Sequence, residues 1–169
     1  MGNQMKYEFT GETQVCFGVT LRRIRRLSDG FVGGWIEQES NLSHEGSTWV
    51  YDNARVYGNA RISGNAQVFN NAQVFGNATV FNNSWVYGNA QAYGDARICG
   101  NATVFNNARV YGDAQIYGDA RVYGDSQVYD NARVDDNAQV FNNARVSGNA
   151  TVFNNARVYD DAQIYGDAR

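Results

Sequence analysis

Few side chains in this sequence are suited to catalysis. The only histidine, His44, could act as a general base if a hydroxyl or amine substrate came within hydrogen-bonding reach. The two cysteines, Cys16 and Cys99, are far apart and lack the spacing of a metal site, so we expect free thiols and a reducing compartment. Asparagine and aspartate recur along most of the chain, which raises the question of calcium binding.

Basic side chains gather at one place only, at Arg22, Arg23, Arg25 and Arg26. Such a patch could meet nucleic acid or an acidic partner. Apolar residues interrupt it, however, and acidic residues surround it, which equally predicts a solvated strand face with local ion pairs. The formal net charge of −3 gives no overall field that would attract nucleic acid or an anionic membrane, and we expect neither partner.

These residues must be positioned by a repeat of six residues that runs without insertion or deletion from Val50 to Arg169, giving 20 hexads. Each hexad reads aliphatic, usually aromatic, Gly/Asn/Asp, Asn/Asp, Ala, then Arg/Gln/Thr. Val56-Tyr57-Gly58-Asn59-Ala60-Arg61 is typical. The fifth and first positions lie two residues apart and therefore face the same side of an extended strand. Gly, Asn and Asp then bend the chain, so each hexad predicts a short strand followed by a corner.

The second positions show how many hexads make one coil. Taken at every eighteenth residue they form three rows. Row C contains Tyr51, Phe69, Tyr87, Phe105, Tyr123, Phe141 and Tyr159; row A contains Tyr57, Phe75, Tyr93, Tyr111, Tyr129, Ser147 and Tyr165; row B contains Ser63, Phe81, Cys99, Tyr117, Asp135 and Phe153. This superperiod predicts three hexads per coil, a triangular prism, and aromatic rings stacked along two of its sides. A narrow interior explains Ala and Val at the inward positions.

Residues 1–49 break the hexad rule, and we predict that they form a separate N-terminal β cap. Residues 7–10 and 14–17 alternate like two short strands, and further strands are expected around residues 19–27 and 33–37. Repeat arrays need such caps to cover the end of the core. The predicted organisation is therefore a cap at 1–49 and an all-β, single-stranded parallel β-helix at 50–169.

The hexads resemble those of the hexapeptide-repeat family, with an aliphatic residue and a small residue four positions later. The resemblance implies a left-handed parallel β-helix. Many members are acyltransferases with a catalytic histidine and with loops that project from the coils. Here His44 lies outside the coils and the coils have no insertions, so we predict that the protein is not an enzyme.

Two other ligands of β-helices can be weighed from the pattern. Calcium-binding β-helix repeats have a period of nine and a Gly-Gly-x-Gly-x-Asp run, which this chain lacks, so the Asn and Asp residues are interpreted as turn-stabilising ladders. Ice binding would need flat ranks of threonine, whereas Thr79, Thr103 and Thr151 are sparse. We predict no cofactor and no metal site.

The N-terminal segments Leu21–Ile24, Gly33–Glu37 and Asn41–Gly46, with Trp49–Ala54, are similar to those of a group of uncharacterised phage and prophage proteins. The resemblance implies phage origin and action in the cytoplasm of an infected bacterium. No apolar run of about 20 residues and no signal-peptide pattern is present, which fits that expectation. The last hexad has no cap after it, so we expect a homo-oligomer formed through the C-terminal coil.

The outer surface of the prism is the most suggestive feature, because aromatic and arginine side chains are enriched at protein interfaces. Trp85 replaces a polar outward residue and is the leading candidate. The predicted protein-binding residues are Trp85, Tyr51, Phe69, Tyr87, Phe105, Tyr123, Arg22, Arg23, Arg25 and Arg26. The leading hypothesis is a non-enzymatic phage protein that blocks a host protein, such as an antiviral defence component. The alternatives are an acyltransferase, a nucleotide-sequestering protein and a structural virion protein.

Overall fold

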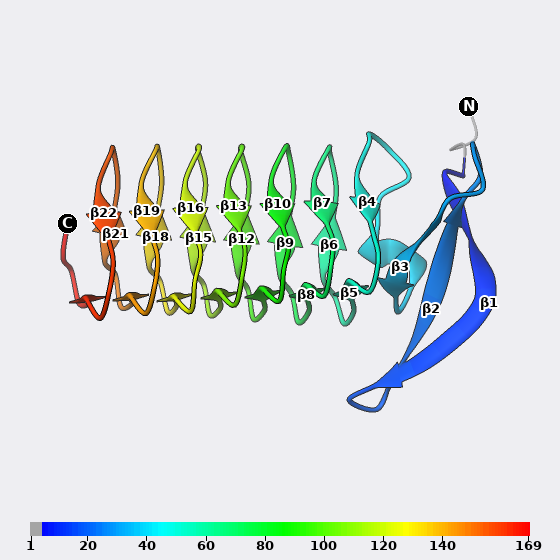
Figure 1. The fold of residues 1–169 in the computed structure, drawn as a ribbon, viewed down its shortest axis with the longest axis horizontal. Helices are drawn as coiled ribbons and strands as arrows, with labels where there is room; N and C mark the ends of the chain where they lie inside the picture. The colour runs from blue at the N-terminus through cyan, green and yellow to red at the C-terminus, as the bar shows by residue number, and fades with distance from the viewer. Residues whose placement is uncertain (1–4) are drawn as a thin grey trace.

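A computed structural model describes residues 5–169 and shows an all-β protein built of stacked coils, with the N-terminal strands at one end (Figure 1). The first three strands are β1 (Tyr7–Cys16), β2 (Val19–Arg26) and β3 (Val32–Ile36), and a single 3-10 turn, η1 (Glu39–Asn41), follows them. Every later strand is two residues long. These are β4 (Trp49–Val50), β5 (Arg55–Val56), β6 (Arg61–Ile62), β7 (Gln67–Val68), β8 (Gln73–Val74), β9 (Thr79–Val80), β10 (Trp85–Val86), β11 (Gln91–Ala92), β12 (Arg97–Ile98), β13 (Thr103–Val104), β14 (Arg109–Val110), β15 (Gln115–Ile116), β16 (Arg121–Val122), β17 (Gln127–Val128), β18 (Arg133–Val134), β19 (Gln139–Val140), β20 (Arg145–Val146), β21 (Thr151–Val152), β22 (Arg157–Val158) and β23 (Gln163–Ile164).

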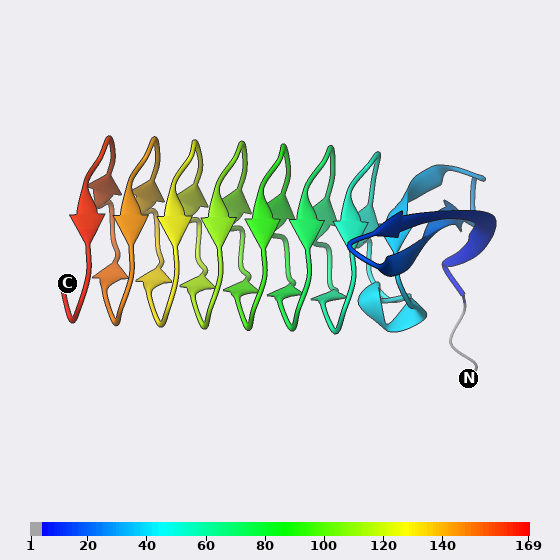
Figure 2. The same ribbon diagram turned by 90° about the horizontal axis from the view of Figure 1, so that it is seen from below.

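Three sheets run along the stack (Figures 1 and 2). Sheet A has ten strands in the order β1-β2-β3-β5-β8-β11-β14-β17-β20-β23, sheet B has six in the order β6-β9-β12-β15-β18-β21, and sheet C has seven in the order β4-β7-β10-β13-β16-β19-β22. Each coil strand pairs in parallel with the strands 18 residues away on either side, as Val86 does with Val68 and Val104. The prediction of three hexads per coil is confirmed. The handedness stays a prediction.

The interior is filled by the fifth and first positions of the hexads, as the sequence predicts. Between Ala54 and Ala150 the alanines and the aliphatic residues of these positions are fully buried. Ser84 and Ser126 replace alanine at the fifth position and are buried too, with each hydroxyl donating to a backbone carbonyl, that of Phe81 (2.8 Å) or that of Tyr123 (2.9 Å). The core is therefore one continuous column of small and β-branched side chains.

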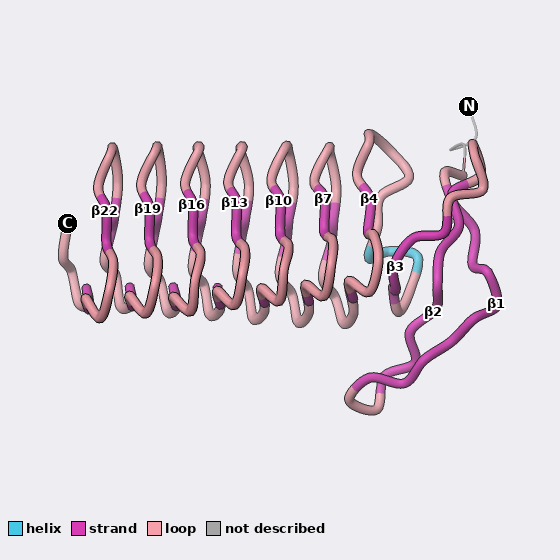
Figure 3. Tube along the Cα trace, viewed as in Figure 1, coloured by secondary structure: helices cyan, strands magenta, loops and turns pink. Residues whose placement is uncertain are grey.

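The corners explain the third position. In all 20 hexads this residue has a positive φ, between 52° and 74°, in the left-handed region that only Gly, Asn and Asp adopt readily. Short strands joined by such corners are seen along the whole array (Figure 3). The fourth position then forms amide ladders: Asn65 donates to Asn83 (3.0 Å), which donates to Asn101 (3.1 Å), which donates to Asp119 (2.8 Å). These contacts confirm the predicted turn-stabilising ladders.

The N-terminal part differs in one respect from the prediction. Residues 7–10 and 14–17 were predicted as two strands, but they belong to one strand, β1, which pairs with β2 through a register shift between Phe9 and Thr13. The prediction was wrong because a bulge lets the pairing resume beyond Gly11, so the break in the alternation is not a break in the strand. The turn falls later, at Phe17 and Gly18, which both have positive φ.

Cap and coils share one core. Strand β3 pairs in parallel with β5, so sheet A continues across the boundary between residues 49 and 50. Gly34 lies where the coils have alanine, and a Cβ there would approach the Ala54 carbonyl oxygen to 2.8 Å. Tyr7 and Ile24 close the end of the column and are buried with Val50. Within residues 5–169, no helix is long and apolar enough to cross a membrane.

Candidate functional site

The predicted aromatic site residues form one stack beside sheet C. Ring centroids are 4.6 Å apart for Phe69–Tyr87, 5.0 Å for Tyr87–Phe105 and 4.8 Å for Phe105–Tyr123, with interplanar angles of 4°, 4° and 7°. Tyr123 also donates its hydroxyl to Gln139, at 3.3 Å. The rings cover one another's faces and present their edges outward. The row therefore stiffens the array, and it leaves a narrow aromatic edge that a partner can touch.

Tyr51 is the exception among the predicted aromatics. Its ring packs edge-on against Phe31, with centroids 5.8 Å apart and an interplanar angle of 65°. The cap therefore interrupts the stacking geometry at its first rung. Tyr51 still lines the same side of the molecule, because it borders a shallow hollow of about 270 Å³ together with Asp52, Gln67, Phe69 and Trp85.

Trp85 is the most exposed large side chain on sheet C between Trp49 and the last coil. It lies on β10 between Gln67 of β7 and Thr103 of β13, and 46% of its surface is exposed. One edge packs against the Phe69 ring, with centroids 6.1 Å apart and an interplanar angle of 75°. The indole is thus fixed at its base and open at its face, as an anchor residue at an interface requires.

The four predicted arginines lie elsewhere, on β2 of the cap, and three of them are in ion pairs. Arg23 pairs with Glu12 at 3.2 Å, Arg25 pairs with Glu8, and Arg26 pairs with Asp29. The Arg26 guanidinium, together with the Phe31 backbone N–H, lowers the pKa of the Asp29 carboxyl to about 2.

The fourth arginine, Arg22, lies over the ring of Phe9 at 5.2 Å. The positive charge of this segment is largely compensated within the cap. The structure does not bring these arginines together with Trp85.

His44 is held by both of its ring nitrogens. Nδ1 accepts a hydrogen bond from the Lys6 backbone N–H at 3.1 Å, and Nε2 lies 2.8 Å from a Glu39 carboxylate oxygen. The ring stacks on Tyr7, with centroids 4.4 Å apart. With Nδ1 accepting, the proton of the neutral ring is on Nε2 and is donated to Glu39. Neither nitrogen is available as an acceptor for a substrate proton.

The other candidate ligands are separate from one another. Cys16 and Cys99 are both free thiols, as predicted. Burial raises the pKa of the Cys99 thiol. In the part of the chain that the structure describes, no group of three or more His, Cys, Asp or Glu side chains could hold a metal ion together.

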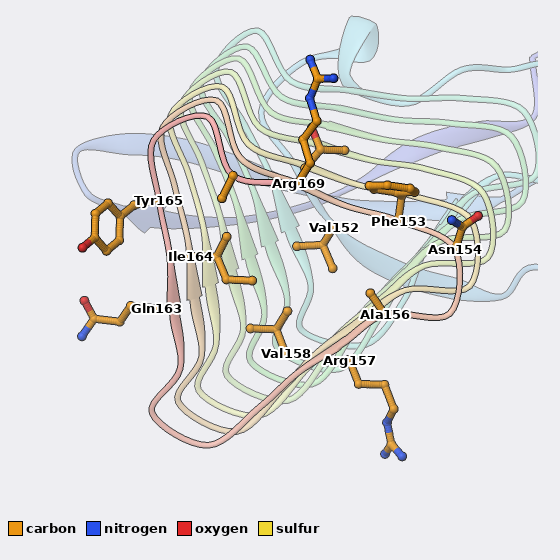
Figure 4. A pocket seen from close by; sticks show the side chains of 12 residues that line it. Val152, Phe153, Asn154, Ala156, Arg157, Val158, Gln163, Ile164, Tyr165 and Arg169 are labelled. Atoms are coloured by element: carbon orange, nitrogen blue, oxygen red, sulfur yellow. The ribbon is translucent and has the colours of Figure 1, made fainter.

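The last coil has an open face that the sequence analysis anticipated. Ala156 and Ala162 are exposed, whereas alanine at this position is fully buried in the middle of the array. Val152, Val158 and Ile164 point into this opening, while Gln163 and Tyr165 point away from it (Figure 4). The hollow that they border has a volume of about 660 Å³.

Sequence reasoning missed a pattern in row B, which it described only as mixed. Its rings, at Phe81, Tyr117 and Phe153, come at every second coil, and small or acidic residues stand between them. The available signal was a period of 36 residues, twice the superperiod of the coil. No ring of row B stacks on another, in contrast to rows A and C.

Comparison with known families gives one result. The family described as YdcK Beta solenoid repeat matches residues 50–61, 72–88, 96–112, 114–128, 126–142, 138–152 and 144–160, which together make up more than half of the chain. The matched segments lie in the coils and include Trp85 and most of the residues of the three rows. No curated protein matches the chain.

Proposed function

The chain belongs to the YdcK Beta solenoid repeat family, and from this premise we propose that it is a binding scaffold that presents one side of a rigid β-solenoid to a partner protein. The observation that carries the proposal is the exposed indole of Trp85, fixed on sheet C beside the stacked rings of row C. A repetitive array positions such groups with little conformational freedom, which lowers the entropy lost on binding.

The contacts around Trp85 indicate how a partner would be held. The hollow next to it is bordered by the rings of Tyr51 and Phe69, and by the polar side chains of Asp52 and Gln67. An apolar or aromatic side chain of the partner can enter this hollow against the indole, while the polar groups at its rim accept or donate hydrogen bonds. The expected complex is therefore centred on Trp85 and extends along the edges of row C.

The nature of the partner rests on the resemblance to phage proteins. On that basis we propose a host protein as the partner, blocked by steric occlusion in an infected cell. The engaged nitrogens of His44 support a role without catalysis.

The proposal is tested by affinity capture with the tagged full chain from infected bacterial lysate. Wild type is compared with Trp85→Thr, which introduces the residue that the neighbouring strand carries at this position, and with Arg109→Gln on sheet A as the matched control. One protein recovered near equimolar amounts with wild type and Arg109→Gln, and reduced about tenfold or more with Trp85→Thr, supports the proposal. Equal recovery with Trp85→Thr contradicts it, as does purified protein that turns over acyl-CoA or retains a cyclic nucleotide.

A second interaction is proposed at the open face of the last coil, where a second copy of the chain would cover Val158 and Ile164. Burying apolar core side chains favours such an association. Light scattering after size exclusion tests it: wild type should form a defined oligomer that Ile164→Asp dissociates. A wild-type protein that is monomeric at high concentration would contradict it.

A further inference from the structure

Row B alternates rings with gaps. Phe81, Tyr117 and Phe153 carry rings, and the coils between them have Cys99 and Asp135 at the same hexad position. In rows A and C consecutive rings lie 4.6–5.0 Å apart and cover one another. Rings two coils apart are therefore about 10 Å apart, twice the strand spacing. That separation leaves room for one planar group between two ring faces.

The gap at Cys99 is already occupied. The guanidinium of Arg97 lies over the Phe81 ring, with its central carbon 5.7 Å from the centroid. The same arrangement occurs in row C, where the Arg157 guanidinium lies 5.2 Å from the centroid of Phe141. A guanidinium is planar and stacks on aromatic faces. This protein therefore uses arginine in the place of an aromatic ring.

The gap at Asp135, which we call the Asp135 slot, has a different floor. One carboxylate oxygen of Asp135, Oδ1, is buried and has no hydrogen-bond partner among residues 5–169. The nearest arginine in sequence, Arg133, lies two residues away on the same strand, yet it forms no ion pair with a described residue and does not stack on Tyr117. A buried carboxylate oxygen without a donor is costly, so this oxygen is poised to accept a hydrogen bond.

The surroundings of the slot are acidic and aromatic. Burial and the neighbouring Asp135 carboxylate raise the pKa of Tyr117 to about 12, which shows how close the two side chains lie. Asp119 and Asp136 stand in the adjoining corners, where the Asp119 backbone N–H donates to the Asp136 carbonyl at 2.7 Å. Three carboxylates thus face one arginine, Arg133, around this slot. The local charge favours a cationic guest.

We propose that the Asp135 slot binds the guanidinium of an arginine side chain from a partner polypeptide. The plane of the guanidinium lies between the rings of Tyr117 and Phe153, and its N–H groups donate to the Asp135 carboxylate. Arginine fits better than lysine because its fork of donors matches a carboxylate and its plane matches the ring faces. The slot lies beside sheet B, so this inference is independent of the surface around Trp85.

The test is a titration of the full chain, followed by NMR, with three peptides that differ at one residue: acetyl-Gly-Arg-Gly-amide and its lysine and citrulline analogues. With the arginine peptide, we expect shifts of the Tyr117 and Phe153 ring protons and an upfield shift of the arginine side-chain methylene next to the guanidinium. Affinity should be about tenfold higher for the arginine peptide than for either analogue, as expected for stacking plus a paired carboxylate. Equal affinity for the arginine and lysine peptides would overturn the proposal.

Three variants locate the site. Asp135→Ser introduces a residue that the chain already tolerates at this hexad position, at Ser63 and Ser147, and should weaken binding about tenfold. Asp135→Phe fills the slot with a ring and should abolish binding. Arg133→Gln removes the competing cation and should leave the affinity equal or higher. Circular dichroism of each variant verifies the fold. Wild-type affinity in both Asp135 variants would show that the arginine does not bind in this slot.

Discussion

Row C and row B run along the same solenoid at the same hexad position, yet they present opposite surfaces. In row C every rung from Phe69 to Tyr159 is a ring, and the faces are covered by neighbouring rings at 4.6–5.4 Å. In row B every second rung is missing, so the faces of Tyr117 and Phe153 have no ring against them. The backbone is the same in both. A filled row stabilises the array, and a gapped row keeps binding groups available.

The distribution of charge follows the same division between cap and coils. The cap arginines Arg23, Arg25 and Arg26 pair with acidic side chains across neighbouring strands or within a turn. The arginines of the coils stand at the sixth position, on the sheet faces, while most aspartates stand at the corners. Among the described residues no coil arginine forms an ion pair. Charged groups in the coils are therefore available to partners, whereas those in the cap are satisfied internally.

Breaking the common frame should have the largest effect. Gly118 has a φ of +66°, and a Cβ there would approach the Asp136 backbone nitrogen to 2.7 Å. Gly118→Val should lower the free energy of unfolding by about 3 kcal/mol, measured by urea denaturation, because a β-branched residue is strained in this region and clashes with the next coil. Gly118→Asn, which introduces a residue common at this position, is the control and should cost about 1 kcal/mol or less. Equal losses would show that the left-handed corner is not the constraint.

Removing one ring from row C makes it resemble row B. Tyr87 stacks on Phe69 and on Phe105, so Tyr87→Ser removes two ring contacts and should lower the free energy of unfolding by about 2 kcal/mol. Ser147→Ala, where row A already lacks a ring, should change it little. A loss under about 0.5 kcal/mol for Tyr87→Ser would mean that stacking contributes little to the stiffness of the array.

The ladders at the fourth position can be repaired in the same way. Asn77 donates to Asp95 at 2.9 Å, but Asp95 cannot donate to Asp113 on the next coil, because ionised carboxylates only accept. Asp95→Asn should restore the ladder, remove a like-charge contact, and raise the free energy of unfolding by about 0.5–1 kcal/mol. The gain should shrink at low pH, where the carboxyls become protonated. A destabilised variant would contradict the ladder.

The smallest effect concerns Tyr117, whose pKa is raised to about 12 by burial and by Asp135. A phenol whose pKa is raised in the folded state contributes stability that is present below pH 10 and is lost as the pH rises towards 12. Asp135→Ser should move the pKa of Tyr117 back towards its usual value, as followed by ultraviolet absorbance of the phenolate. An unchanged titration would show that Asp135 does not act on this ring.

The sequence predicts much of the fold because one hexad specifies a strand, a corner and an inward pair, and because row C repeats at 18 residues. It does not predict the continuity of β1, since Gly11 and the residues after it interrupt the alternation and the bulge is set by pairing with β2. Nor does it predict the ion pairs of the cap arginines. Glu8 meets Arg25 only because the two are opposite each other in the β1–β2 register.

The candidate sites show the same limit. Trp85 is conspicuous in the sequence because it replaces a polar residue, and the structure confirms that it is exposed. The Asp135 slot is not conspicuous, because its parts come from three coils and its meaning depends on rings that lie 36 residues apart. A local pattern finds an unusual residue, whereas a vacancy between residues requires the spatial register.

The measurement that tests the account most directly is the unfolding free energy of Cys99→Phe. If the gaps of row B are vacant rungs of an otherwise complete ladder, the new ring will stack between Phe81 and Tyr117, displace the Arg97 guanidinium, and raise the free energy of unfolding by about 1 kcal/mol in urea denaturation. If the space between these rings is closed, the larger side chain will be overpacked, and the variant will be destabilised by about 1–3 kcal/mol. That result would contradict both the vacancy and the division between filled and gapped rows.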